Sequence, residues 1–501
     1  MKLADEPRAN GRQTTSPSGA AKPRHLQRRH ADQHRLLDHH GARLAACGSR
    51  CACIIVVPQN MITLTYNMVR QGRAQAIALE FERRIQAGAV SAGERLPAVR
   101  ALAVELEVDP GTAAAAYRLL RERGFVISDG RRGTRVAAQL ELRPSRVNQL
   151  PAGIRDLASG VVDPVLVPEV SQALKRVAAR SPRVTRYEEN AKLDALVAHA
   201  EAEFGRAGVD ATALSFVSGT LDGLERVLQA HLRPGDRVGV EDPAFPRLLD
   251  LLQALNLRAV PIAIDDEGLD PDQLDRALTR GLEALIVTPH GQNPFGASLS
   301  DERASTLGRL LGMHELLLVE DAHGWEVEQR PSTLTGGEGR WAVIRSMSRL
   351  LGADVRLAFV AGDQQTVARV EARQAVTTSW VSCLLQEVVA EMLASADVRR
   401  QLRRASAETS KRRLALLTAL ERRGVRAHGR SGLHAWIPVR EEVFAVRRLL
   451  DAGYAVLAGE RFRLRTPPAV RVTTAKLLPA EVEPLADALV EAAASQSLIS
   501  Y

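Results

Sequence analysis

Apolar residues recur at helical spacing in two neighbouring stretches that follow residue 68 of the chain. In "NMVRQGRAQAIALEFERRIQAG" one helical face carries Ala74, Ile77, Ala78, Phe81 and Ile85. The stretch "LPAVRALAVELEV" repeats the period with Val99, Leu102, Ala103 and Leu106. A spacing of three and four residues between apolar positions is typical of an amphipathic helix, so both stretches are predicted to be helical.

A third helix and a hairpin complete this segment. In "DPGTAAAAYRLLRERG", Asp109 is a suitable N-cap, Pro110 suits the first helical position and Gly124 can end the helix. In "FVISDGRRGTRVA" two short apolar strands surround a turn rich in Gly and Arg. Three helices followed by a β-hairpin predict a winged helix-turn-helix over residues 68–138.

The pattern changes after a polar segment, residues 139–155, which contains Pro144 and Pro151 and is predicted to be a linker. Over residues 156–498 helical stretches alternate with short apolar runs: "RVGVEDP", "EALIVTPH", "LLLVEDAH", "WAVIRSMS" and "VRLAFVAG". Such alternation predicts an α/β domain with a mainly parallel sheet. Each run ends in a polar or small residue, and ligands of such sheets bind at the carboxyl ends of the strands.

Charge separates these segments. Residues 1–60 hold ten Lys and Arg against four Asp and Glu, and residues 68–138 hold twelve against eight. The remainder holds 45 against 47, so the basic pI of about 9.7 belongs to the first part of the chain. A small basic domain beside a nearly neutral large one favours nucleic-acid contact by the small one.

Residues 1–60 have no apolar periodicity and are predicted to be disordered or a wrongly assigned extension, with Met61 or Met68 as the alternative start. The segment "CGSRCAC" fits no zinc-binding spacing, so no metal site is expected. Four cysteines are too few for a disulfide-built secreted protein. No apolar stretch is long enough to span a membrane, and we expect a cytoplasmic protein.

Residues 85–136, "IQAGAVSAGERLPAVRALAVELEVDPGTAAAAYRLLRERGFVISDGRRGTRV", resemble the GntR-type winged helix. The resemblance implies that residues 112–123 form the helix that enters the major groove of an operator. This sequence departs from the family pattern at "DPGTAA", where relatives usually carry Ser or Arg before the Thr, and this leaves the base specificity open. The alternative is that the small domain binds protein instead of DNA. The candidate DNA contacts are Arg95, Arg100, Thr112, Tyr117, Arg118, Arg131, Arg132 and Gly133.

The large domain contains six motifs of interest: "SGTLDGL", "EDPAFP", "GQNPFG", "LVEDAHG", "SMSRLLGADVR" and "PAVRVTTAKL". Together they resemble the class I aminotransferases, over about residues 155–495. With the winged helix in front, the chain resembles the MocR-like subgroup of GntR regulators. The resemblance implies the fold type I architecture of pyridoxal-phosphate-dependent transferases and a homodimer.

The resemblance also implies a role for each motif. Ser218, Gly219 and Thr220 would cradle the cofactor phosphate at a helix start, with Ser346, Ser348 and Arg356 beside them. Phe245 would stack on the pyridine ring, Asn293 would bind its ring oxygen with His323 nearby, and Asp321 would face its nitrogen. Arg471 would bind a substrate or effector carboxylate. Taken singly, these residues have plainer alternatives: a strand-to-helix turn, a core Phe, a helix cap and a surface charge.

Arg349 departs from the family pattern, because relatives carry a lysine there that forms a Schiff base with the cofactor. Arginine stays protonated and can neither condense with an aldehyde nor act as a base near neutral pH. None of the six lysines of the chain lies in a motif that would reach the aldehyde. Three outcomes stay open: non-covalent pyridoxal phosphate, recognition of an anion such as a phosphorylated vitamer or a carboxylate effector, or a decayed site kept for dimerisation.

The sequence therefore predicts a transcription regulator that binds double-stranded DNA and whose dimeric aminotransferase-like domain senses a small amino-acid or vitamin-B6-like ligand. A working pyridoxal-phosphate-dependent aminotransferase with a fused DNA-binding domain is the alternative. A dimeric scaffold without ligand is a third. Whether the chain is an enzyme depends on Arg349, and catalysis is not expected without the lysine.

Overall fold

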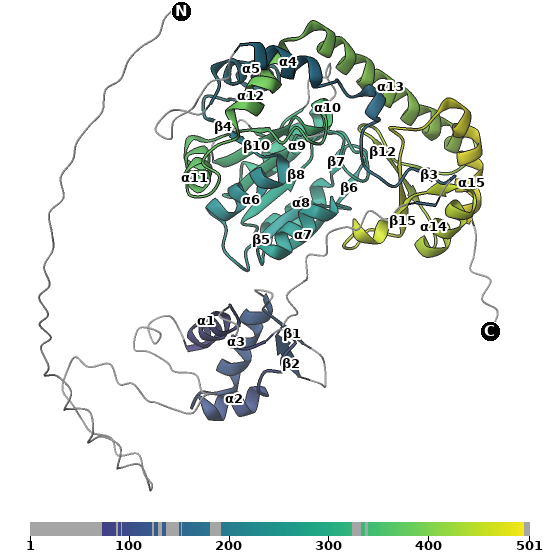
Figure 1. The fold of residues 1–501 in the computed structure, drawn as a ribbon. Helices are drawn as coiled ribbons and strands as arrows, with labels where there is room; N and C mark the ends of the chain where they lie inside the picture. The colour runs from purple at the N-terminus through teal and green to yellow at the C-terminus, as the bar shows by residue number, and fades with distance from the viewer. Residues whose placement is uncertain are drawn as a thin grey trace, which may run out of the picture. The chain divides into compact units, whose positions relative to one another are not determined.

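The fold is that of a computed structural model, shown in Figure 1. It describes residues 73–86, 89–91, 93–122, 125–128, 133–136, 150–151, 153–180, 192–322, 332–335 and 339–494. The predicted extension 1–60, most of the predicted linker, and the candidate residues Arg131, Arg132 and His323 lie outside the described residues.

The described residues between 73 and 136 form the predicted winged helix-turn-helix. Its helices are α1 (Arg73–Gln86), α2 (Val99–Glu105) and α3 (Pro110–Glu122), and its wing is the antiparallel pair β1 (Val126–Ser128) and β2 (Thr134–Val136). The apolar positions that predicted the helices meet in one core, which includes Ile77, Phe81 and Leu102. Asp109 accepts a hydrogen bond from the backbone N–H of Gly111 across 2.6 Å, as an N-terminal capping residue does.

The large domain is built on a sheet whose described strands number eight. In spatial order they are β4 (Leu214–Val217), β11 (Ala358–Gly362), β10 (Arg340–Ser346), β9 (Leu317–Asp321), β8 (Ala284–Val287), β5 (Arg237–Asp242), β6 (Arg258–Asp265) and β7 (Gly268–Leu269). The neighbours from β10 through β6 pair in parallel, whereas β11 and β7 run antiparallel to their neighbours. The mainly parallel sheet predicted from the alternating pattern is confirmed.

Helices cover both faces of this sheet, which explains why its central strands are apolar on both sides (Figure 1). One face packs on α6 (Thr220–His231), α7 (Pro246–Ala254) and α11 (Gln364–Ala375). The other packs on α4 (Ser171–Ala179), α5 (Asp194–Arg206), α8 (Pro271–Thr279), α9 (Asp301–Leu311) and α12 (Cys383–Ala394).

A second, smaller sheet follows the long helix α13 (Ala396–Glu421). Its strands are β12 (His434–Pro438), β15 (Ala469–Thr473) and β14 (Leu457–Ala458), packed by α14 (Glu442–Asp451) and α15 (Val482–Ala494). Arg155, the last residue of the predicted linker, begins β3 (Arg155–Asp156), which pairs with β13 (Tyr454–Ala455). Three short 3-10 turns complete the described elements: η3 (Pro164–Leu166), η4 (Gly459–Arg461) and η5 (Pro479–Glu481).

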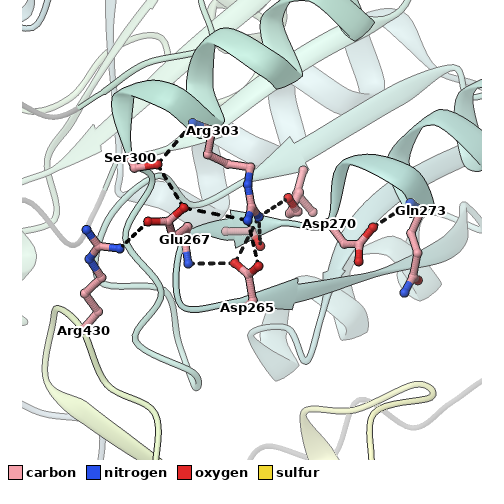
Figure 2. Close-up of polar contacts among 9 residues, drawn as sticks. Asp265, Glu267, Asp270, Gln273, Ser300, Arg303 and Arg430 are labelled. Atoms are coloured by element: carbon pink, nitrogen blue, oxygen red, sulfur yellow. Dashed lines mark hydrogen bonds and ion pairs between the residues drawn. The ribbon is translucent and has the colours of Figure 1, made fainter.

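Ion pairs join the β6–β7 hairpin to α9 and to the segment before β12 (Figure 2). Arg303 binds both carboxylate oxygens of Asp265 across 3.0 and 2.8 Å, and Arg430 binds Glu267 across 2.9 Å. Ser300 caps α9 and donates to Glu267, while Asp270 caps α8 by accepting from the backbone of Gln273. The Arg430–Glu267 pair therefore links the β6–β7 hairpin of the large sheet to the segment that leads into β12.

Two further details concern the segments of Arg349 and Arg471. Arg349 lies in a short helix, α10 (Ser348–Leu351). Lys476 lies beyond the end of β15 at Thr473, and its carbonyl accepts a hydrogen bond from Arg155. No helix among the described residues is both long and apolar enough to cross a bilayer.

Candidate ligand site

The predicted site residues gather at one edge of the large sheet. Ser218 follows β4, Asn293 follows β8, and Asp321 and Ser346 end β9 and β10. Arg356 precedes β11, whose antiparallel direction brings its amino end to the same edge, because Ala358 pairs with both Ser346 and Val217. This is the edge at which parallel sheets bind ligands.

Arg356 ties together two of the segments that form the predicted phosphate cradle. Its Nη2 donates to the carbonyl of Ser218 across 2.9 Å, and its Nη1 donates to Oγ of Ser348 across 3.2 Å. Ser346 accepts a hydrogen bond from the backbone N–H of Ser348 across 3.2 Å. The exposed guanidinium thus lies between the start of α6 and the start of α10.

Gly219 leaves room for that guanidinium. It precedes α6 with a φ of +102°, which L side chains rarely adopt. A Cβ here would lie 2.9 Å from Cζ of Arg356 and overlap its Nη2. Because the first N–H groups of a helix have no partner within it, the start of α6 at Thr220 and the Arg356 guanidinium form a site suited to a phosphate.

Asp321 lies at the end of β9 among groups that resist ionisation. It is buried, with 6% of its surface exposed. Nearby, burial raises the pKa of Glu241 to about 8, opposed by hydrogen bonds from Thr288 and Gln292 and assisted by the Asp321 charge. Glu241 is therefore mainly neutral at pH 7.

Arg349 is half-buried beside Asp321. Burial lowers the pKa of Arg349 to about 10, although the Asp321 carboxylate opposes the shift. The guanidinium therefore remains protonated at neutral pH. A protonated guanidinium has no lone pair with which to attack an aldehyde, so the chemistry argued from the sequence holds in this environment.

Arg471 reaches the site from the smaller sheet. Its Nη1 donates to Oδ1 of Asn293 across 3.2 Å, its Nη2 donates to the carbonyl of Ala158, and its guanidinium lies 5.1 Å from the ring centre of Phe462. Burial and the nearby Arg349 charge lower the pKa of Arg471 to about 9, opposed by Asp156. Arg471 is therefore a buried cation at the site and not a surface charge.

Two aromatic residues that the sequence placed in binding sites, Phe245 and Tyr117, pack against hydrophobic cores. Phe245 is half-buried, caps α7 and packs against the core between α6, α7 and the sheet. Tyr117 is only 1% exposed, packs edge-on against Phe81 and donates its hydroxyl to the carbonyl of Pro97 across 2.8 Å. The prediction that Tyr117 contacts DNA is wrong in this structure, because its side chain is used in the core of the winged helix.

The remaining described DNA candidates lie at the surface of the winged helix or near it. Arg95, Arg100 and Arg118 are exposed, and Thr112 is half-buried in the first turn of α3. Gly133 directly precedes β2, with a φ of +95° and open space where a side chain would lie. The three arginines are therefore accessible to solvent, and their contact with DNA stays a prediction.

Three residues at the ligand site were not singled out from the sequence. Gln292 donates to Glu241 across 3.2 Å and to the carbonyl of Pro243 across 2.8 Å, which holds the segment before Asn293. Phe462 lies under Arg471. Gln292 and Glu241 belong to the motifs "GQNPFG" and "EDPAFP", so the sequence could have identified them as site residues. Phe462 belongs to none of the six motifs, and nothing in the sequence indicated its role.

Family comparisons agree with this geometry. Residues 153–489 match the family described as aminotransferase class I and II, and residues 73–136 match the bacterial regulatory proteins of the gntR family. The fold and site define a winged-helix regulator joined to an aminotransferase-like domain. The chain belongs to the MocR-like GntR regulators, as the resemblance in its motifs indicated.

Two curated relatives carry the names of transcription regulators. The chain is 34% identical over 429 residues to the vitamin B6 salvage pathway transcriptional repressor PtsJ of Salmonella typhimurium. The match covers 84% of this chain and 98% of that protein. It is 24% identical over 338 residues to the pyridoxine biosynthesis transcriptional regulator PdxR of Corynebacterium glutamicum, covering 65% and 74% of the two chains.

Solved aminotransferases share the fold of the large domain. A multiple substrate aminotransferase from Thermococcus profundus aligns with a TM-score of 0.64 at 19% identity, covering 70% of this chain and 95% of that one. A kynurenine aminotransferase from Pyrococcus horikoshii aligns with a TM-score of 0.62 at 20% identity, covering 68% and 91%. At these identities the likeness establishes the fold, which is the predicted fold type I.

Aminotransferases of this family bind pyridoxal phosphate, and most of the residues present here suit that group. The space at Gly219, the donors around Arg356 and the buried carboxylate of Asp321 match a phosphate at one end and a pyridine nitrogen at the other. Arg349 does not suit a covalent link to the aldehyde.

Proposed function

We propose that this protein is a cytoplasmic transcription regulator whose winged helix binds an operator and whose aminotransferase-like domain holds a phosphorylated pyridine ligand without a covalent bond. The observation that carries the proposal is the contrast within one site. The hydrogen bonds of Arg356 to Ser218 and Ser348 support a phosphate site there, whereas Arg349 replaces the lysine needed for transamination. Such a site can bind and release its ligand, as a sensor must.

The residues would divide the work as follows. The phosphate would be held by the segments at the starts of α6 and α10 together with Arg356, that is, by Ser218, Gly219, Thr220, Ser346, Ser348 and Arg356. Asp321 pairs with the ring nitrogen and keeps it protonated. Asn293, held by Arg471, donates its amide N–H to the ring oxygen. Phe245 would stack on the ring, and Arg471 would face an acidic group of a ligand.

Regulation would arise from a difference in ligand affinity between two arrangements of a homodimer. Dimerisation of the aminotransferase-like domain would place two winged helices on one duplex and set the spacing of the half-sites. A ligand that binds one arrangement more tightly then changes operator affinity. The names of PtsJ and PdxR, which refer to vitamin B6 pathways, support a ligand of this chemical class.

The alternative function, a working aminotransferase, requires a group that forms a Schiff base and moves a proton. Arg349 can do neither at neutral pH, since even with its lowered pKa of about 10 it stays protonated. We therefore expect no transaminase turnover by the wild-type protein.

The test is a selection of DNA from a random duplex library by the purified full chain, followed by gel shifts of the selected duplex with and without pyridoxal phosphate. We expect a preferred sequence with two half-sites and a change of at least several-fold in affinity on adding the ligand. Arg356→Gln should bind the duplex but lose the ligand response.

Recovery of no preferred sequence would exclude operator binding. If a preferred sequence is recovered but the affinity for it does not change with pyridoxal phosphate or with its amine and carboxylate analogues, ligand sensing is excluded while operator binding stands. Transaminase activity of the wild-type chain would favour the enzyme instead.

A further inference from the structure

The ligand site carries more positive than negative charge. Arg349, Arg356 and Arg471 all reach it, and the carboxyl group of Asp321 lies beside Arg349. Glu241 adds little negative charge at pH 7, because burial raises its pKa to about 8. Asp156, which faces Arg471, already accepts from the backbone N–H groups of Ala158 and Ser159.

A phosphate would account for only part of this excess. The dianion belongs with Arg356 and the start of α6, where the donors converge. The positive charges of Arg349 and Arg471 would remain, and the Asp321 carboxyl group could balance one of them. Desolvated unbalanced charge is costly, so a ligand that brings a second negative group is favoured over one that does not.

The three arginines differ in how their donors are used. Arg356 donates to Ser218 and Ser348, and both terminal nitrogens of Arg471 have protein acceptors in Asn293 and Ala158. The Arg349 guanidinium, in contrast, donates no hydrogen bond to any residue that the structure describes. A half-buried guanidinium with unused donors is suited to a carboxylate, which can accept two parallel hydrogen bonds.

We propose that Arg349 selects a ligand with an anionic substituent: a phosphorylated pyridine that carries a carboxylate at the ring position where pyridoxal phosphate carries its aldehyde. This inference rests on the proposed function, because it assumes that the same site binds a phosphorylated pyridine. The replacement of lysine by arginine then changes the chemistry that is recognised, from an aldehyde that condenses with an amine to an acid that pairs with a guanidinium.

The proposal orders three ligands that differ in one substituent. The carboxylate should bind most tightly, because it gains charge-assisted hydrogen bonds from Arg349. The aldehyde, which is neutral, should be intermediate. The amine form is protonated at pH 7 and should bind most weakly, because its ammonium group would meet the guanidinium. We expect the carboxylate to be favoured over the amine by about ten- to hundredfold, the usual worth of hydrogen bonds to charged groups.

Titration calorimetry of the full chain with pyridoxal phosphate, pyridoxamine phosphate and 4-pyridoxic acid phosphate tests this order. Arg349→Gln removes the charge and should reduce the preference for the carboxylate over the amine to within about threefold. Arg356→Gln is the matched control: it should weaken all three ligands alike and preserve their order, because all three carry the phosphate. Arg349→Lys tests whether a cation of any shape suffices, and we expect it to keep only part of the preference. Thermal unfolding shows that each variant is folded.

The outcomes separate this inference from the proposed function. A carboxylate that binds no more tightly than the amine, or a preference that Arg349→Gln leaves unchanged, overturns the role of Arg349 while pyridoxal phosphate binding stands. Failure of all three ligands to bind the wild-type chain overturns both the inference and the ligand part of the proposed function.

Discussion

Arg471 on β15 holds Asn293, 178 positions away in the chain, by a hydrogen bond of 3.2 Å between Nη1 and Oδ1. The contact joins the smaller sheet to the loop after β8, and Gln292 anchors the same loop to Glu241. The amide oxygen of Asn293 therefore accepts from protein, and within the described part of the chain no acceptor binds its N–H groups, which suits them to a ligand.

Asn293→Ala should loosen Arg471 and remove a ligand contact. We expect about a tenfold loss of affinity for pyridoxal phosphate, which is what one or two hydrogen bonds in a buried site contribute. Calorimetry measures it. Gln253→Ala, at an exposed position on α7, serves as the control. Unchanged affinity in the Asn293 variant would show that the amide does not contact the ligand.

Gly219→Ala tests the space for Arg356. The new methyl group would overlap the guanidinium and displace it from Ser218. Affinity for phosphorylated pyridines should fall by about tenfold or more, because the charge-assisted phosphate contact is lost. Gly281→Ala is a matched control, since Gly281 also has a positive φ of +83° but no atom within 4 Å of its Cβ position. If both variants lose ligand equally, backbone strain and not the Arg356 contact is responsible.

Arg349→Lys should restore a covalent link to pyridoxal phosphate. A lysine in this buried setting loses its proton more readily than arginine and can condense with the aldehyde. The wild-type protein should show no borohydride-sensitive visible absorbance band with the ligand, whereas the variant should gain one. A band in the wild type would contradict the reading of Arg349, and its absence in the variant, with reversible binding retained, would show that the aldehyde lies out of reach.

Stability should depend on pH through Glu241. Its pKa is raised by burial to about 8, so the folded state favours the protonated form. That stability is fully present below the ordinary value of about 4.5 and is lost as the pH rises through about 8. Glu241→Gln keeps a neutral side chain at every pH and should flatten the decline.

Thermal unfolding of both proteins between pH 5 and pH 9 is the measurement, and we expect the variant to gain a few degrees relative to wild type at the alkaline end. Glu320, whose burial raises its pKa to about 7, should preserve part of the slope in the variant. Parallel curves for the two proteins would show that Glu241 does not titrate in this range.

The winged helix offers a contrast between a surface arginine and a buried tyrosine. Arg100→Ala should weaken binding to every duplex and reduce the salt dependence of the binding constant by about one unit, as loss of one phosphate contact does. Tyr117→Phe removes the hydroxyl that donates to Pro97 and should lower the stability of the domain by about 1 kcal/mol. It should leave the selected DNA sequence unchanged. Gel shifts at several salt concentrations and thermal unfolding distinguish the two.

Local patterns carried much of the prediction. The helical periodicity around Phe81 and the capping residue Asp109 recovered the winged helix, because both signals act over a few residues. The apolar runs recovered β5, β8, β9, β10 and β11. Strands β4, β6 and β12 were not recognised, because short runs such as "LSFV" lie against polar or helical neighbours and carry no distinctive period. Most of the site motifs stand at or just after strand ends, whereas Arg471 lies in the middle of β15.

Local patterns in the sequence predicted most of the elements, the two domain types and the replacement of lysine by Arg349. The surroundings of each side chain are known from the folded chain alone, which has Tyr117 in a core, Phe462 under Arg471, and Glu241 in a buried place where it is mainly neutral at pH 7. The order of strands in a sheet brings together residues that are 100 or more positions apart, as Arg356 and Ser218 show. The burial and charge where they meet depend on every strand between them.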